Sequence, residues 1–301
     1  MFRNQPIGIF DSGVGGLTVY RALHARLPDE QFIYLGDTAR VPYGTKSLET
    51  VERYAIENSQ FLASRGIKLL VVACNTASAL ALPAIRFAVG IEVVGVIGPG
   101  ARKAVALTKE KRRQPKIGVI ATEATVSSRA YSEAIRKACE NAEIIETACP
   151  LFVPLAEENW TREPETRSIA KKYLQKIIDK NVDALVLGCT HYPILRKVIQ
   201  ETVGANVILI DSGEATAEEV KKLLEDKKLT SENPQKREIK RRLCDDLDHF
   251  YVTDAADRFA RVAERFLGEK PAKLEAIEVF GKDKLEKRQN SRNFETTDLH
   301  R

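Results

Sequence analysis

The chain is predicted to be an α/β protein with two similar lobes, each built on a mainly parallel sheet flanked by helices. The apolar runs 69–73 and 184–188 have the length and branching of strands buried on both faces, which is typical of parallel sheets. Three landmarks also recur in the same order, at offsets of 110, 112 and 115 residues: Ile7 with Ile117, Val41 with Val153, and Cys74 with Cys189. This ordered set indicates a duplicated βα unit, whose corresponding loops would face each other across a cleft.

The first copy alternates strands with helices. Its strands are predicted at 7–10, 31–35, 67–73 and 91–97. The glycine-rich turn 13–16 opens a first helix, and a second helix runs from about 47 to 65. Because Gly98-Pro99-Gly100 interrupts the pattern after the fourth strand, the chain is expected to cross into the second lobe there.

The second copy repeats this order. Its strands are predicted at 116–121, 143–147, 183–188 and 207–210, with a helix from about 163 to 180 before the third of them. The turn Asp211-Ser212-Gly213 then repeats the earlier turn Asp11-Ser12-Gly13. After a highly charged connection, 227–242, a strand at 249–253 and a helix at 255–267 are expected to rejoin the first lobe.

These elements predict a discontinuous first lobe and a continuous second one. The first lobe would comprise residues 1–98 and 210–268, and the second would comprise 99–209. Residues 269–301 are charged and polar with scattered apolar positions, which favours a charged C-terminal tail over a third domain.

Composition predicts a soluble cytoplasmic protein. The chain has 301 residues, enough for two domains, with 44% hydrophobic and 30% charged residues. It has neither an apolar stretch of membrane-spanning length nor a secretory leader, so no membrane partner is expected. Five cysteines without paired spacing fit a reducing compartment better than a disulfide framework. The basic run 109–113 lacks interleaved aromatic residues, so nucleic acid is not expected as a partner.

Two cysteines, Cys74 and Cys189, follow the apolar runs directly and carry the main chemical prediction. Ligands of parallel sheets bind outside the carboxyl ends of the strands, where both thiols would lie. Cys74 precedes a helix and His191 follows Cys189 by two residues, and both settings can tune a thiol. Two thiols on opposite faces of a stereocentre could remove a proton from one face and deliver one to the other without a cofactor. Taken singly, each could instead be an ordinary buried core cysteine.

Polar residues near these strand ends suit an amino-acid substrate. Asp11 could hold an ammonium group, and carboxylates could be held by Ser12, Asn75, Thr76, Thr122 and Thr190. The alternative is that these residues only cap helices. A metal is not expected, because Cys74, Cys189 and His191 have no evident fourth ligand. The turn 13–16 is not a dinucleotide fingerprint, so nucleotide binding has little support.

Four motifs in order resemble those of bacterial glutamate racemases, in the aspartate/glutamate racemase family: 10–18, 36–44, 73–78 and 187–193. The resemblance covers about residues 5–268. It implies two pseudo-symmetric α/β lobes with the active site in the interlobe cleft. It also implies cofactor-independent interconversion of L- and D-glutamate, which supplies D-glutamate for peptidoglycan, and a homodimer.

The same resemblance implies a role for each matching residue. Cys74 would act on the D-enantiomer and Cys189 on the L-enantiomer, with Asp11 and His191 assisting the neighbouring thiols. The substrate pocket would comprise Asp11, Ser12, Tyr43, Gly44, Asn75, Thr76, Thr122, Thr190 and His191. Three alternatives remain open: an aspartate racemase of the same fold, a hydrolase with Cys189 as nucleophile and His191 as base, and a two-lobed binding protein.

Overall fold

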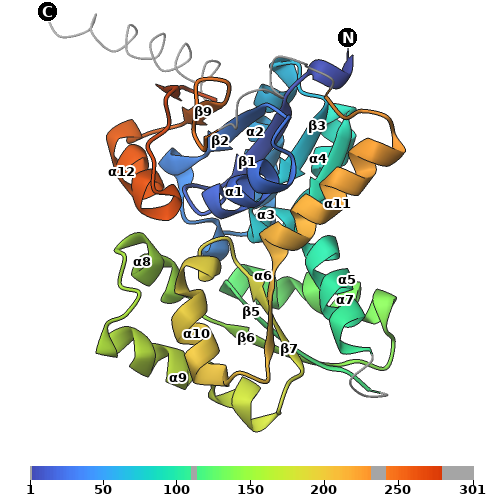
Figure 1. The fold of residues 1–301 in the computed structure, drawn as a ribbon, viewed down its shortest axis with the longest axis vertical. Coiled ribbons are helices and arrows are strands. Elements are labelled where there is room, and N and C mark those ends of the chain that lie inside the picture. The colour runs from blue at the N-terminus through green and yellow to red at the C-terminus, as the bar shows by residue number, and fades with distance from the viewer. Residues whose placement is uncertain (1, 110–113, 232–241, 280–301) are drawn as a thin grey trace, which may run out of the picture.

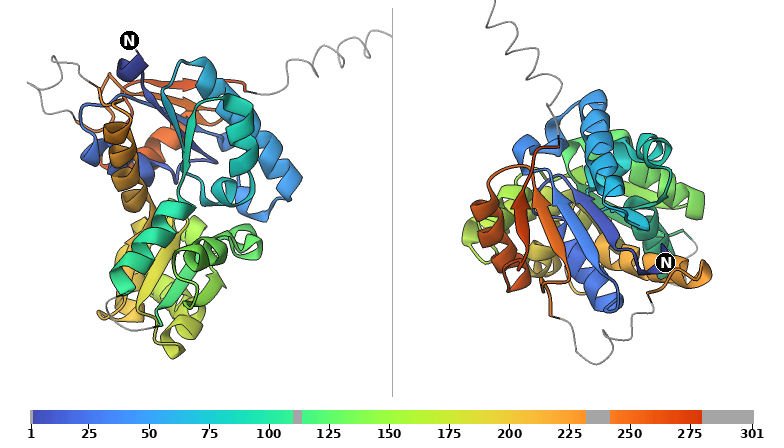
Figure 2. Two further views of the ribbon diagram at one scale, coloured as in Figure 1. Left: turned by 90° about the vertical axis from the view of Figure 1, so that its right-hand side faces the viewer. Right: turned by 90° about the horizontal axis from the view of Figure 1, so that it is seen from above.

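The computed structural model describes residues 2–109, 114–231 and 242–279. Two separate β-sheets form the centres of two parts of the molecule, which lie one above the other in Figure 1 and in the left view of Figure 2. Every strand pairing in both sheets is parallel. The predicted α/β class with parallel sheets is therefore confirmed. No helix among the described residues is both long and apolar enough to cross a bilayer.

Sheet A, in the upper part, has the strand order β10-β9-β2-β1-β3-β4. Its strands are β1 (Ile7–Asp11), β2 (Phe32–Gly36), β3 (Leu69–Val72), β4 (Glu92–Gly95), β9 (His249–Val252) and β10 (Leu274–Ala276). The view from above in Figure 2 shows these strands side by side. β9 lies next to β2, so the chain after the second copy does return to the first sheet.

Sheet B, in the lower part, has the order β6-β5-β7-β8. Its strands are β5 (Lys116–Ala121), β6 (Glu143–Ala148), β7 (Ala184–Gly188) and β8 (Ile208–Asp211). Strands β1 to β4 of sheet A lie in the order β2-β1-β3-β4, which matches β6-β5-β7-β8 in sheet B. In this match β1 corresponds to β5, and β3 corresponds to β7. This shared order supports the duplication that the sequence indicates.

Helices flank both sheets. Around sheet A they are α1 (Leu17–Arg26), α2 (Leu48–Ser64), α3 (Asn75–Leu80), α4 (Leu82–Val89), α11 (Ser212–Asp226) and α12 (Ala256–Leu267). Around sheet B they are α5 (Ile97–Thr108), α6 (Glu123–Ser128), α7 (Ala130–Ala138), α8 (Phe152–Glu157), α9 (Pro164–Asp179) and α10 (Arg196–Val203). Short 3₁₀ turns occupy Phe2–Asn4, Thr38–Arg40, Tyr43–Thr45 and Tyr192–Leu195. α11 packs against both α1 and α5 and so touches helices of both parts.

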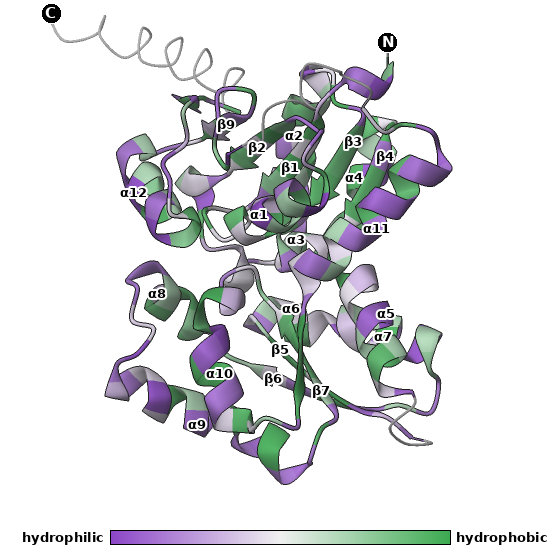
Figure 3. Ribbon diagram, in the orientation of Figure 1, coloured by the Kyte–Doolittle hydropathy of each residue, from purple (hydrophilic) through white to green (hydrophobic). Residues whose placement is uncertain are grey.

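The central strands of both sheets are buried because helices cover both sheet faces. All five residues of β1 and all five of β7 are buried, and Figure 3 shows the strands as mainly hydrophobic. One hydrophobic cluster includes Ile9 and Leu17 together with Leu187 and Phe152, so it joins residues of both parts. Burying these side chains contributes roughly 25 cal/mol for each Å² of apolar surface removed from water.

Some elements differ from the sequence-based expectation. β10 lies in the segment that was expected to be a charged tail. The helix after Cys74 breaks at Ala81, and α4 continues with Pro83 in its first turn, where proline is tolerated. Residues 110–113 of the basic run, 232–241 of the charged connection and 280–301 of the tail lie outside the described residues.

Candidate active site

Three strand ends bring the predicted site residues together. Asp11 is the last residue of β1, Cys74 follows β3 at the start of α3, and Cys189 directly follows β7. β1 pairs with β3 in parallel, which places Asp11 and Cys74 side by side at the carboxyl ends of these strands. The two cysteines are 5% and 6% exposed, so each is almost fully enclosed but not sealed.

Cys74 lies in an environment that favours the neutral thiol. Its sulfur lies 3.5 Å from the hydroxyl oxygen of Ser12 and accepts the backbone N–H of Ala77 at 3.4 Å. Burial, followed by the negative charge of Asp11, raises the pKa of Cys74 to about 12. The charge of Cys189 contributes to this rise in the pKa of Cys74 as well. The free site therefore holds Cys74 in its protonated form.

Cys189 belongs to a chain of polar groups. Its sulfur lies 3.8 Å from Nδ1 of His191, whose Nε2 lies 3.1 Å from a carboxylate oxygen of Glu157. Burial alone would lower the pKa of His191, but its hydrogen bonds to Cys189 and Glu157 raise it to about 10. The imidazole is therefore a cation at neutral pH and stabilises negative charge on the neighbouring sulfur.

Glu157 was not predicted from the sequence. It ends α8, 34 residues before His191, and its second carboxylate oxygen accepts Arg258 of α12 at 3.1 Å. Burial would raise the pKa of Glu157, but His191 and Arg258 lower it below its ordinary value. No local motif marks this residue, because its partners come from two other elements.

Two buried polar atoms in the site have no hydrogen-bond partner among the described residues. Asp11 accepts the backbone N–H of Gly13 through Oδ2, whereas its Oδ1 is unpaired. The amide Nδ2 of Asn75 is the second unpaired atom. Burial raises the pKa of Asp11, and the charge of His191 partly offsets that rise. An unpaired acceptor and an unpaired donor are what an ammonium and a carboxylate would satisfy.

Hydroxyl groups from both parts of the molecule meet beside α3. Thr76 lies 3.0 Å from Thr122 and 3.2 Å from Thr125, measured between hydroxyl oxygens. Gly44 packs closely on Thr122, because a Cβ at position 44 would lie 2.8 Å from the Cβ of Thr122. Thr125 was not predicted as a site residue, although it stands in the same short segment as Thr122.

Tyr43 is brought next to the site but its hydroxyl is engaged elsewhere. It donates to the buried carboxylate of Asp37, which also accepts the side-chain amide of Asn58 at 3.0 Å. Burial and the charge of Asp37 raise the pKa of Tyr43 well above its ordinary value. The Tyr43 side chain therefore fixes the loop that carries Gly44, and its hydroxyl is not a free donor for a ligand.

The loop after β7 packs directly against the turn after β1. The hydroxyl of Thr18 in α1 donates to the backbone carbonyl of Thr190 at 2.8 Å. A Cβ at Gly15 would clash with the Thr190 hydroxyl and would lie 2.5 Å from the His191 ring. The glycine-rich turn thus permits close approach of the Cys189–His191 loop. This close approach explains why the turn has glycine at position 15.

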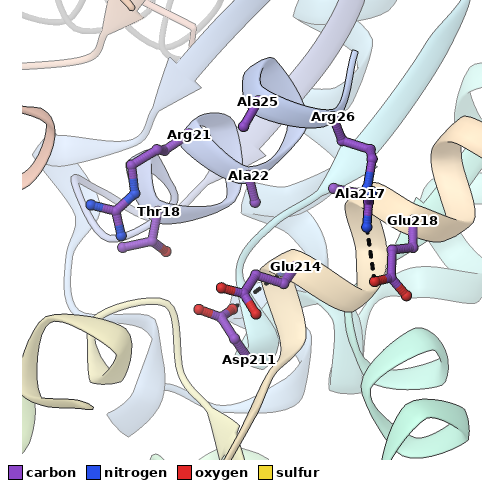
Figure 4. A pocket seen from close by; sticks show the side chains of 9 residues that line it. All are labelled: Thr18, Arg21, Ala22, Ala25, Arg26, Asp211, Glu214, Ala217 and Glu218. Carbon is purple, nitrogen blue, oxygen red and sulfur yellow. Dashed lines mark hydrogen bonds and ion pairs between the residues drawn. The ribbon is translucent and has the colours of Figure 1, made fainter. Parts of the chain in front are cut away.

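A separate cavity of about 470 Å³ lies between α1 and α11. Figure 4 shows its lining, with the ion pair between Arg26 and Glu218 at one end, Thr18 and Arg21 at the other, and Asp211 and Glu214 between them. It contains none of the site residues predicted from the sequence, although Thr18 is shared between the cavity and the Thr190 contact. Its lining carries the cations of Arg21 and Arg26 and the carboxyl groups of Asp211, Glu214 and Glu218. Among the described residues, no three metal-ligating side chains form a cluster.

Known proteins are similar to this chain in fold and, over most of its length, in sequence. A family model described as Asp/Glu/Hydantoin racemase matches residues 7–220. The chain is 51% identical to the glutamate racemase of Geobacter metallireducens over 266 residues, which cover 88% of this chain and 94% of that relative. The structure is similar to that of the Francisella tularensis glutamate racemase in complex with D-glutamate, with a TM-score of 0.82, 38% identity, and 92% and 98% of the two chains covered. It is also similar to a Bacillus anthracis glutamate racemase, with a TM-score of 0.84, 36% identity and the same coverage. The chain therefore belongs to the Asp/Glu/hydantoin racemase family.

Proposed function

We propose that this protein is a glutamate racemase that interconverts L- and D-glutamate by proton transfers between the substrate α-carbon and two cysteines, without a cofactor. The observation that carries the proposal is the pair Cys74 and Cys189, which follow equivalent strands of the two copies, with the loop after Cys189 packed against the turn after β1. Curated relatives named as glutamate racemases support glutamate rather than aspartate as the substrate. The product D-glutamate would serve peptidoglycan synthesis in the cytoplasm, and the enzyme would act as a homodimer.

The reaction removes a proton from one face of the α-carbon and then delivers a proton to the opposite face. Starting from D-glutamate, the Cys74 thiolate takes the α-proton, and the C–H electron pair passes into the carboxylate. The Cys189 thiol then returns a proton to the opposite face, which yields L-glutamate and a Cys189 thiolate. The reverse reaction exchanges the two roles, and the His191 cation stabilises the Cys189 thiolate.

Substrate binding would itself prepare Cys74. The free site disfavours the Cys74 thiolate because the thiol is buried beside the Asp11 carboxylate. The ammonium group of an amino acid would bind the unpaired Oδ1 of Asp11 and neutralise that charge. Nearby hydroxyls and the Asn75 amide would hold the carboxylates. Cys74 would thus lose its proton to solvent water and become a base mainly when a substrate with an ammonium group is present.

Deuterium exchange with single-cysteine variants tests this proposal. In D₂O, inversion of L-glutamate should place solvent deuterium at the α-carbon, as detected by NMR. Cys74→Ser and Cys189→Ser should each reduce racemisation by about 10²–10⁴-fold, because a serine hydroxyl is too weak an acid for either role. Cys139→Ser is the matched control and should leave the rate unchanged. Cys139 is a partly exposed cysteine at the end of α7. Racemisation that survived loss of Cys74 would disprove the two-base mechanism.

A second candidate function has one specific observation in its favour. Cys189, His191 and Glu157 form a chain of nucleophile, base and orienting carboxylate, an arrangement that also occurs in cysteine hydrolases. Such a hydrolase would not need Cys74. The Cys74→Ser variant therefore distinguishes the two: a hydrolase keeps its activity on ester or amide substrates, whereas a racemase loses turnover.

A further inference from the structure

The side-chain amide of Asn75 is held in one orientation by a residue of the other part of the molecule. Tyr131, in the first turn of α7, donates its hydroxyl proton to Oδ1 of Asn75 at 2.6 Å, and both side chains are buried. An amide is planar, so an Oδ1 fixed on Tyr131 directs Nδ2 away from it. That Nδ2 is buried and has no partner among the described residues.

The orientation matters because an asparagine amide presents either donors or an acceptor, depending on which way it is turned. With Oδ1 on Tyr131, the two N–H donors remain for a ligand, and a carboxylate accepts such donors. If the amide were turned over, its oxygen would face the carboxylate and repel it. The unpaired, buried amide nitrogen of Asn75 is thus a preformed hydrogen-bond donor. The hydrogen bond from Tyr131 decides whether this nitrogen or the amide oxygen faces the ligand.

Tyr131 is itself rigidly placed. It is fully buried, and a Cβ at Gly188, the residue before Cys189, would lie 3.0 Å from its ring. Burial raises the pKa of Tyr131 well above its ordinary value, so the hydroxyl keeps its proton and remains a donor. The ring therefore packs beside the strand that delivers Cys189, while the hydroxyl reaches the residue that follows Cys74.

We propose that Tyr131 is a positioning residue for substrate recognition: by fixing Oδ1 of Asn75 it directs the amide N–H donors to a carboxylate of the substrate. This inference rests on the proposed racemase function. Tyr131 touches no reacting atom in this scheme, and it acts only through Asn75. Because it comes from α7 and Asn75 from α3, the donor site is complete only when the two parts are docked as observed.

The Tyr131→Phe variant removes the hydroxyl and keeps the ring that packs against Gly188. Racemisation kinetics should show KM for glutamate raised about tenfold, the effect of losing one well-formed hydrogen bond. The value of kcat should change less than about twofold, because the carboxylate contact is present in both the bound substrate and the transition state. Tyr20→Phe is the matched control: Tyr20 is an equally buried tyrosine whose hydroxyl donates to Asp248, and its loss should leave KM unchanged.

A second variant tests the donor role without touching Tyr131. Asn75→Asp has nearly the same shape and still accepts the Tyr131 hydroxyl, but it offers no N–H group. Its KM should rise at least as much as that of Tyr131→Phe. Provided that the wild-type enzyme racemises glutamate, an unchanged KM in either variant would overturn the inference. A Tyr131→Phe variant with lower kcat and unchanged KM would overturn it as well. If the wild-type protein does not racemise glutamate, the proposed function itself is wrong.

Discussion

At the scale of single residues, Cys189 and Glu157 together keep His191 charged. The imidazole has a pKa of about 10 instead of its ordinary 6.5, with Glu157 as one of the groups that raise it. A group whose pKa is raised by folding stabilises the folded state fully below its unfolded pKa, and this stabilisation is lost as pH rises through the folded value. His191 should therefore stabilise the protein below about pH 6.5 and cease to do so near pH 10.

Glu157→Gln tests this dependence. The variant should be less stable than the wild type by about 1–3 kcal/mol near pH 6, because a charge-assisted hydrogen bond to a buried cation is lost. The difference should shrink as pH rises and vanish above about pH 10, where the imidazole is neutral in both proteins. Urea denaturation at a series of pH values measures it.

Glu158→Gln provides the control for this series, since Glu158 is the exposed neighbour at the end of α8. It should follow the wild-type stability curve throughout. A Glu157→Gln deficit that stayed constant from pH 6 to pH 10 would show that the carboxylate packs or caps α8 without stabilising a charged imidazole.

The pattern of apolar runs could predict the residues at strand ends, whereas Tyr43 and Gly44 were predicted only through the resemblance of motif 36–44. Asp11, Cys74 and Cys189 are identifiable because apolar runs end at or directly before them, and parallel strands bring such ends together. Glu157 and Tyr131 reach the site from helices that lie far from these motifs in the chain. Their contribution depends on how the two parts dock, which periodicity does not specify.

At the scale of elements, the turn between β1 and α1 requires glycine at position 15 because another element occupies the space of a side chain. Gly15→Ala should push the Thr190 hydroxyl and the His191 ring away from their observed places. Overpacking of this kind costs about 1–3 kcal/mol, and the displaced imidazole would no longer lie beside Cys189. We therefore expect a lower melting temperature together with at least a tenfold loss of kcat/KM.

Gly98→Ala is a suitable comparison for this change. It lies in α5, and a Cβ there meets only the flexible end of the Arg102 side chain, at 3.2 Å. Alanine also has the higher helix propensity, so this variant should be as stable as the wild type or slightly more stable. Equal kinetics for Gly15→Ala and Gly98→Ala would contradict the close packing of the two loops.

Among the elements, those with strong periodicity were predictable and the short ones were not. The strands of both copies stand out because they are continuous apolar runs, and α9 because its apolar residues recur on one face. β10 has only the three residues Leu-Glu-Ala and is identified by its pairing with β9, which no local pattern indicates. α8, which carries Glu157, is similarly short.

At the scale of the whole molecule, the two sheets repeat one strand order and share a hydrophobic cluster. The sequence predicted the repeat from three matched landmarks, and the structure supports it through the order of eight strands. It could not predict the contacts by which the copies meet, such as that of Thr76 with Thr122 and that of Asn75 with Tyr131. These contacts join side chains far apart in the chain, which no local pattern specifies.

The position of the site between the copies predicts how a ligand should protect the chain. Glutamate held by Asp11 and Asn75 on one side and by Thr190 on the other would stabilise both parts at once. At a concentration of about 100 times Kd, openings that break the site should become about 100-fold rarer. Hydrogen exchange should therefore slow in residues 75–80 and in 189–195 together, whereas α9, on the outer side of sheet B, should exchange as before. Mass spectrometry of peptides from these three segments measures the effect, with the Asn75→Asp variant expected to show weaker protection of both site segments at equal glutamate. Protection confined to one of the two segments would mean that the ligand binds a single copy, and the two thiols could not then act on opposite faces of one carbon.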